Sequence, residues 1–212
     1  MTKIQVLAKL KFMKYKFLAG LFFVSGLACA QYLEVNDIDI FINRFDDLNE
    51  MLNWYKPTED EDVWKGYRAS VAALFNLTNN THNLMDEERL FKRRLKSFKD
   101  SFLEVIHYKI PEAIEDAFRN AGWKNNGNKK FWTIYYGYTL LEKKRELDLF
   151  IAELNEKMEG RNFDADDMTE FEAFRNAFRV VDKNITKIVE ILHAKDTELI
   201  KNRFNELLEL LD

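Results

Sequence analysis

Turn-forming residues are scarce in this chain. Its 212 residues include two prolines, Pro57 and Pro111, and seven glycines, two of which lie within the first 30 residues. Folds built from many short strands need Gly, Pro and other turn residues at frequent intervals. The scarcity therefore argues against a β-sandwich or an α/β fold and favours long helices.

Cysteine is nearly absent, since Cys29 is the only one. Residues 31–212 therefore have no intramolecular disulfide, no thiol for catalysis and no cysteine ligand for a metal. A domain without disulfides relies on its hydrophobic core, and this segment is long enough to build one. No Pro-rich or Ser-rich linker divides it, so we expect a single domain over 31–212.

The first 30 residues have the three parts of a secretory signal peptide. Five lysines and no acidic residue precede an apolar run over 17–27, and Ala28-Cys29-Ala30 ends it. The run is too short to span a bilayer, which needs about 20 residues. We therefore expect cleavage after Ala30, export to the periplasm or the medium, and no transmembrane segment in the mature chain.

Cys29 leaves a second interpretation open. A lipoprotein signal also ends in small residues before a cysteine, which is lipidated and becomes the mature N-terminus. Such signals usually carry a large apolar residue three positions before the cysteine, where this chain has Gly26. Soluble export with Gln31 at the N-terminus is the first expectation, and a lipid anchor at Cys29 is the alternative.

The charge of the predicted mature chain argues against nucleic acid as a partner. Cleavage removes five lysines and no acidic residue, which leaves 27 basic and 36 acidic residues and a formal charge of −9. Nucleic-acid phosphates are bound by clustered Lys and Arg. Local basic runs such as Lys143-Lys144-Arg145 are either solvated faces or a docking site for an acidic partner.

Apolar residues recur every three or four positions in five segments, which is the spacing of amphipathic helices. Pro111 predicts a kink or restart, Gly122 a helix C-cap, and Asp167 with Glu170 an N-cap. The fold class that follows is all-α: an antiparallel helical bundle of five or six helices. The predicted helical segments are 37–55, 58–75, 84–121, 129–159 and 167–192, with a kink or a separate terminal helix after 195–197.

The fifth predicted helix has the most regular apolar stripe, and we expect it to be central to the fold. The stripe consists of Phe171, Phe174, Phe178, Val181, Ile185, Ile188 and Leu192.

A Glu-x-x-His pair occurs twice, as Glu104 with His107 and as Glu190 with His193. Two such pairs, with one Glu from each of two further helices, form the ligand set of di-iron carboxylate bundles. However, the apolar stripes place Glu104 and Glu190 on the outer sides of their helices. A metal site is therefore a minor hypothesis, and we expect no cofactor.

Aromatic residues surround one end of the fourth predicted helix nearly completely. A segment of this kind is either a centrally buried helix or the lining of an apolar ligand pocket or interface. Gly137 within it would allow close approach of another group. The candidate ligand or partner residues are Trp123, Phe131, Trp132, Tyr135, Tyr136 and Tyr138.

The sequence contains no nucleophile elbow, phosphate-binding loop, dinucleotide fingerprint, HExxH or haem-attachment motif. We therefore expect no catalytic residue. The favoured function is an exported, non-catalytic helical bundle that binds a protein partner in the cell envelope. The alternatives are a carrier of an apolar small molecule or lipid and, third, a di-metal carboxylate enzyme.

Overall fold

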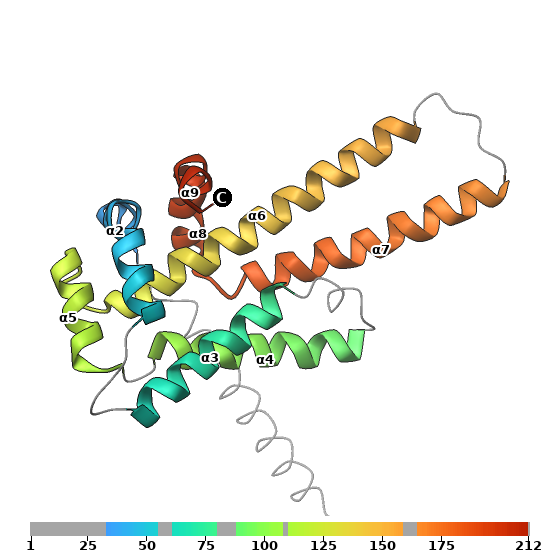
Figure 1. The fold of residues 1–212 in the computed structure, drawn as a ribbon. Coiled ribbons are helices and arrows are strands. Elements are labelled where there is room, and N and C mark those ends of the chain that lie inside the picture. Colours follow the sequence, from blue (N-terminus) through green and yellow to red (C-terminus); the bar gives the residue numbers. More distant parts are fainter. Residues whose placement is uncertain (1–32, 55–60, 80–87, 108–109, 159–164, 212) are drawn as a thin grey trace, which may run out of the picture.

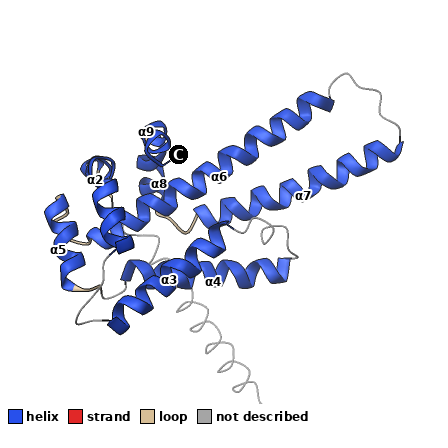
Figure 2. Ribbon diagram, viewed as in Figure 1, coloured by secondary structure: helices blue, strands red, loops and turns tan. Residues whose placement is uncertain are grey.

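The computed structural model describes residues 33–54, 61–79, 88–107, 110–158 and 165–211. Within these ranges every regular element is a helix and there is no strand (Figure 2). The expected all-α class and the single helical domain are therefore confirmed. The signal segment with Cys29 lies outside the described residues, as do Pro57 and Gly160.

The described ranges contain eight helices, so the expected count of five or six is wrong. None of them is long and apolar enough to cross a membrane. Their bounds are α2 Val35–Trp54, α3 Glu61–Asn79, α4 Glu88–His107, α5 Glu112–Ala121, α6 Gly127–Met158, α7 Ala165–Val189, α8 Ala194–Asn202 and α9 Phe204–Leu211.

The additional helices arise where a segment predicted as one helix is interrupted and a new helix begins. Pro111 is the N-cap of α5, and its carbonyl accepts hydrogen bonds from the N–H groups of Ile114 and Glu115. A proline is well suited to this position. The backbone N–H that proline lacks would have no acceptor within the helix at its start. As predicted, Gly122 is the C-cap of α5, and its φ of +119° is a left-handed conformation that glycine adopts without strain.

The C-terminal breaks differ from the prediction. The N-cap of α7 is not Asp167, since this helix already begins at Ala165 and ends at Val189, before Leu192. His193 then caps α8: its backbone is extended and its ring Nδ1 accepts a 3.3 Å hydrogen bond from the N–H of Lys195. Arg203 separates α8 from α9.

Helix α6 is the centre of the structure, a place that we had expected the helix over 167–192 to hold. It packs against α2, α4, α5, α7 and α8, while α3 pairs with α4. Figure 1 shows α7 running back alongside α6, and both helices extending beyond the other elements. Among the described elements, the outer halves of α6 and α7 therefore have one another as their main neighbours.

The described side chains of the predicted apolar stripes either form the buried core or pack against it while partly buried. Phe41, Val105 and Ile185 are among the buried residues, and so is Leu192 beyond the end of α7. The side chains of Phe171, Phe174 and Phe178 lie outside the described part. Between Phe131 and Leu141 nearly every side chain of α6 is buried, as expected of a helix that is apolar all round.

Candidate functional site

The six predicted ligand residues divide among different surroundings. Trp123 lies in the turn before α6 and packs against Phe118 of α5, with ring centroids 5.8 Å apart. Tyr138 contacts Phe204 of α9 at 5.3 Å, and Tyr136 is fully buried. Phe131, Trp132 and Tyr135 alone line a common hollow, so the structure does not assemble the six into one site.

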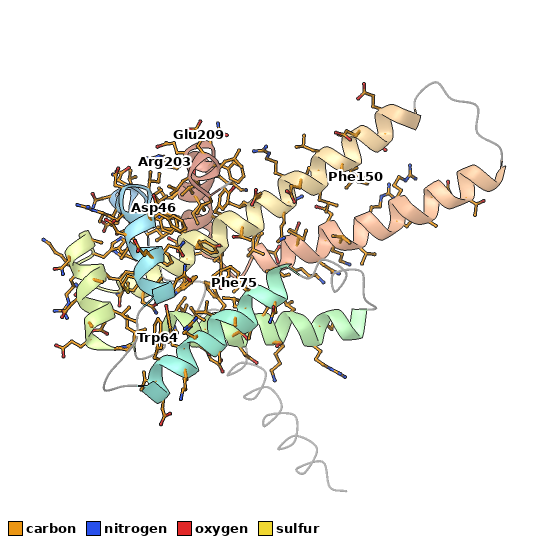
Figure 3. The ribbon with its side chains drawn as sticks, in the orientation of Figure 1. Asp46, Trp64, Phe75, Phe150, Arg203 and Glu209 are labelled. Atoms are coloured by element: carbon orange, nitrogen blue, oxygen red, sulfur yellow. The ribbon has the colours of Figure 1, made fainter. Side chains whose placement is uncertain are left out.

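That hollow lies between α2, α3 and α6 and has a volume of about 240 Å³. Its rings already contact one another: Phe131 and Trp132 lie 5.0 Å apart, and Phe75 lies 5.5 Å from Tyr135. Figure 3 places Phe75 between α3 and α6. The aromatic end of α6 is therefore mainly a packed core, and the hollow is a small opening at its edge.

A buried polar network joins α3, α4 and α6 beneath this hollow. The Tyr67 hydroxyl donates a 2.6 Å hydrogen bond to Asn128 Oδ1 and accepts one from the Trp132 indole N–H. The Asn128 amide in turn donates a 2.8 Å bond to the carbonyl of Val105. Nothing in the sequence pattern marks Asn128, because a single polar residue at a helix start is usually exposed.

The buried tyrosines are not suited to acid–base chemistry near neutral pH. Burial raises the pKa of Tyr67 and Tyr136 well above the usual range, although the bond from Trp132 lowers that of Tyr67. Burial likewise raises the pKa of Tyr135, and the negative charge of Glu142 raises it further. All three phenols are therefore neutral hydrogen-bonding groups.

The two Glu-x-x-His pairs lie on surfaces. Glu104 is exposed and accepts a 3.2 Å hydrogen bond from Ser70, and Glu190 is exposed beyond the end of α7. Their predicted outward placement is confirmed. In the described ranges no three His, Cys, Asp or Glu side chains gather where they could hold one metal ion.

A larger cavity lies between the end of α4, helix α5 and the turn that leads into α6. It has a volume of about 540 Å³, and Trp123 and His107 belong to its lining. Burial lowers the pKa of His107, and the charge of Lys129 lowers it further. The Trp123 indole N–H is buried and has no acceptor among the described residues.

A third hollow, of about 530 Å³, lies where α6 and α7 meet α8 and α9. Leu141, Leu149, Val189 and Phe204 supply apolar lining. Lys144 on its rim bonds to Asp148 at 3.1 Å and to Asp182 at 2.5 Å, which ties α6 to α7. Burial lowers the pKa of Lys144, but these two carboxylates outweigh it, and the net direction is upward.

Large apolar side chains are also exposed on the two long helices that border this hollow, Leu149 and Phe150 on α6 and Val180 on α7. Leu149 is 54% exposed, Phe150 41% and Val180 43%. Figure 3 shows Phe150 on the part of α6 that extends away from α2, α5 and α9. We call Leu149, Phe150 and Val180 the arm patch.

Comparison with protein-family models, curated proteins and solved structures finds no match for this chain.

Proposed function

We propose that the protein is an exported, non-catalytic helical bundle that binds a protein partner in the cell envelope. The observation that carries this proposal is the arm patch. Leu149 is 54% exposed and lines the apolar hollow, and exposed apolar surface beside a hollow supports a protein-binding role. The parts of α6 and α7 that extend beyond the other helices in Figure 1 are accessible to a partner.

The chemistry around the hollow specifies the partner further. Arg145 and Lys201 line it beside the apolar side chains, and the Arg145 guanidinium lies 5.4 Å from the centroid of the Phe204 ring. Because two carboxylates neutralise Lys144, Arg145 and Lys201 supply the net positive charge of the rim. We infer an amphipathic segment that places apolar residues on the arm patch and an acidic residue near Arg145.

Export through the segment 1–30 is part of the same proposal. Leu33, two residues after Gln31, is fully buried, so a mature chain that starts at Gln31 would keep every described core residue. Intact mass of the protein recovered from the envelope tests the processing. A mass that corresponds to a chain starting at Gln31 would support soluble export. A mass that corresponds to a chain starting at an acylated Cys29 would support the lipoprotein alternative.

The partner proposal is tested by crosslinking in intact cells. A photo-crosslinking residue at position 149 should capture a defined protein, identified by mass spectrometry. The combined variant Leu149→Asp with Val180→Asp should lose this capture from a crosslinker at position 150. Val35→Asp is the matched control, because Val35 is also an exposed apolar residue, at 57%, but lies on α2. Equal capture by the arm variant would contradict the proposal.

A carrier of an apolar small molecule is the second candidate, favoured by the aromatic hollow at Phe131, Trp132 and Tyr135. Its volume of about 240 Å³ is below the roughly 300–1,000 Å³ of typical ligand sites. Organic extraction of the purified protein tests this function. A stoichiometric lipid or aromatic compound in the extract would place the carrier first.

A further inference from the structure

We propose that the solvent-facing side of α4 binds the anionic surface of a phospholipid bilayer. Between positions 89 and 99 this helix has six basic residues and no acidic one. We call the four whose side chains are described the basic face: Lys92, Arg93 and Lys96 are exposed, and Lys99 is partly buried. This function goes beyond the protein partner of the arm patch, because it concerns another helix and another class of target.

The basic face is turned away from the core. Successive residues of an α-helix are rotated by about 100°, so Arg93 and Lys96 lie nearly opposite Phe98 and Phe102 on α4. Both phenylalanines are buried, at 4% and 5% exposure, where α4 packs against α3 and α6. The four basic positions follow one another over about 10 Å of helix, at a rise of about 1.5 Å per residue. One side of α4 therefore presents a continuous row of positive charge to solvent.

The neighbouring helix α3 does not neutralise this charge. Figure 1 shows α3 and α4 running in opposite directions, and Ser70 of α3 donates a 3.2 Å hydrogen bond to Glu104 of α4. The part of α3 that lies along the first half of α4 is therefore 70–79, which contains no charged residue. Within α4, six basic and three acidic residues leave a formal charge of +3. The basic face therefore keeps a net positive charge.

The basic face offers charge without an apolar anchor. No described residue of α4 is among the large apolar side chains that are exposed in this structure. A protein interface usually has an apolar centre, which the arm patch offers and the basic face lacks. Anionic lipid headgroups, by contrast, attract clusters of Lys and Arg through charge alone. The chemistry of the basic face therefore matches a bilayer surface better than a folded protein.

The negative net charge of the whole chain does not prevent this contact. Salt screens exposed charges beyond about 8 Å at physiological ionic strength, so the charges nearest the bilayer dominate its attraction. Figure 1 shows α3 and α4 on one side of α6, with α8 and α9 on the other. The apolar hollow beside the arm patch lies at α8 and α9. A bilayer on the basic face therefore leaves this hollow accessible to a protein partner.

The experiment is co-sedimentation of the purified protein with vesicles of phosphatidylcholine alone or with about 30% phosphatidylglycerol added as the anionic lipid. Binding to the anionic vesicles should be at least tenfold tighter than to the neutral ones, and should weaken as salt is added. Arg93→Glu with Lys96→Glu should weaken it at least tenfold, because each basic residue near an anionic surface strengthens binding about fivefold. Both positions are exposed, so we expect these variants to fold, and circular dichroism checks this.

Two controls separate the basic face from general charge and from the partner site. Lys183→Glu with Lys195→Glu makes the same charge change at exposed positions of α7 and α8 and should weaken vesicle binding less than threefold. Leu149→Asp with Val180→Asp should bind the anionic vesicles at least half as tightly as the unchanged protein.

Four results would overturn the proposal and leave the protein-partner function untouched. They are equal binding to neutral and anionic vesicles, binding that salt does not weaken, equal losses in the two charge-reversed variants, and tighter binding to duplex DNA than to the anionic vesicles. All variants have the same N-terminal segment, so differences between them come from the substituted positions.

Discussion

The backbone N–H of Leu33 donates a 3.0 Å hydrogen bond to the carboxylate of Asp196, 163 residues further along the chain. Both residues are 0% exposed. Asp196 lies in the first turn of α8, where a negative charge is favourable, and it therefore connects the start of the fold to its C-terminal helices. The buried amide of Leu33 would lose this acceptor if Asp196 were removed.

Asp196→Ala should consequently lower the free energy of unfolding by about 1–3 kcal/mol, because it removes a buried hydrogen bond to a charged group. Asp196→Asn keeps an acceptor oxygen and should cost less. Urea titration followed by circular dichroism measures both. Glu198→Ala, at an exposed position of the same helix, is the control and should change stability by less than about 0.5 kcal/mol. Equal effects of the alanine substitutions at 196 and 198 would contradict this role.

Tyr67→Phe tests the polar network of α3, α4 and α6. The loss of this hydroxyl removes the hydrogen-bond partner of the Asn128 side-chain Oδ1 and of the Trp132 indole N–H. We expect the free energy of unfolding, measured by urea titration, to fall by about 1–3 kcal/mol. Tyr136→Phe is the matched control, because the Tyr136 hydroxyl makes only a 3.5 Å contact with the carbonyl of Val71. It should cost less than about 1 kcal/mol.

Tyr67→Phe should also change how the free energy of unfolding depends on pH. Burial raises the pKa of Tyr67 in the folded state, so the fold holds this phenol in its neutral form. Its contribution to stability is fully present below about pH 10, the ordinary pKa of tyrosine, and is lost as the pH rises above that value. The free energy of unfolding should therefore fall above about pH 10, and less steeply in Tyr67→Phe. An identical slope in both proteins would exclude this origin.

The sequence pattern predicted the buried faces of the helices better than it predicted where the helices begin and end. Three-four spacing places Phe41, Val105 and Ile185 on buried faces because helix periodicity and burial are coupled locally. The N-cap at His193 escaped prediction, since capping is usually read from Ser, Thr, Asp and Asn. The sequence also indicated the wrong helix as the central one. A regular apolar stripe identifies one buried face of a helix but not how many other helices pack against it.

The candidate site was predictable only in part. The aromatic content of 131–138 indicated an unusual helix end, and burial on nearly all sides accounts for it. The cavity between α4, α5 and the start of α6 had no sequence signal beyond Trp123, since its lining combines α4, α5 and the turn before α6. Such a combination depends on tertiary packing that no short motif encodes.

Gly137→Ala tests how closely α8 packs on α6. A Cβ at this position would lie 2.4 Å from Cδ1 of Ile200, which is fully buried. Overpacking should cost about 1–3 kcal/mol, partly offset by the roughly 1 kcal/mol higher helix propensity of alanine. Ile200→Val removes that Cδ1 and should alone cost about 0.5–1.5 kcal/mol. The double variant should cost less than the sum, whereas strict additivity in thermal or urea unfolding would contradict direct contact.

The metal hypothesis makes the last prediction, since it separates a binding protein from an enzyme. A metal held by Glu104, His107, Glu190 and His193 would stabilise the folded state, and a chelator would lower the Tm. We expect an unchanged Tm with chelator and no stoichiometric iron, manganese or zinc by elemental analysis. His107→Ala should be tolerated because its ring is exposed, whereas His193→Ala should cost about 0.5–2 kcal/mol through loss of the α8 cap. One or two metal ions per chain, lost in both variants, would instead make the di-metal enzyme the leading function.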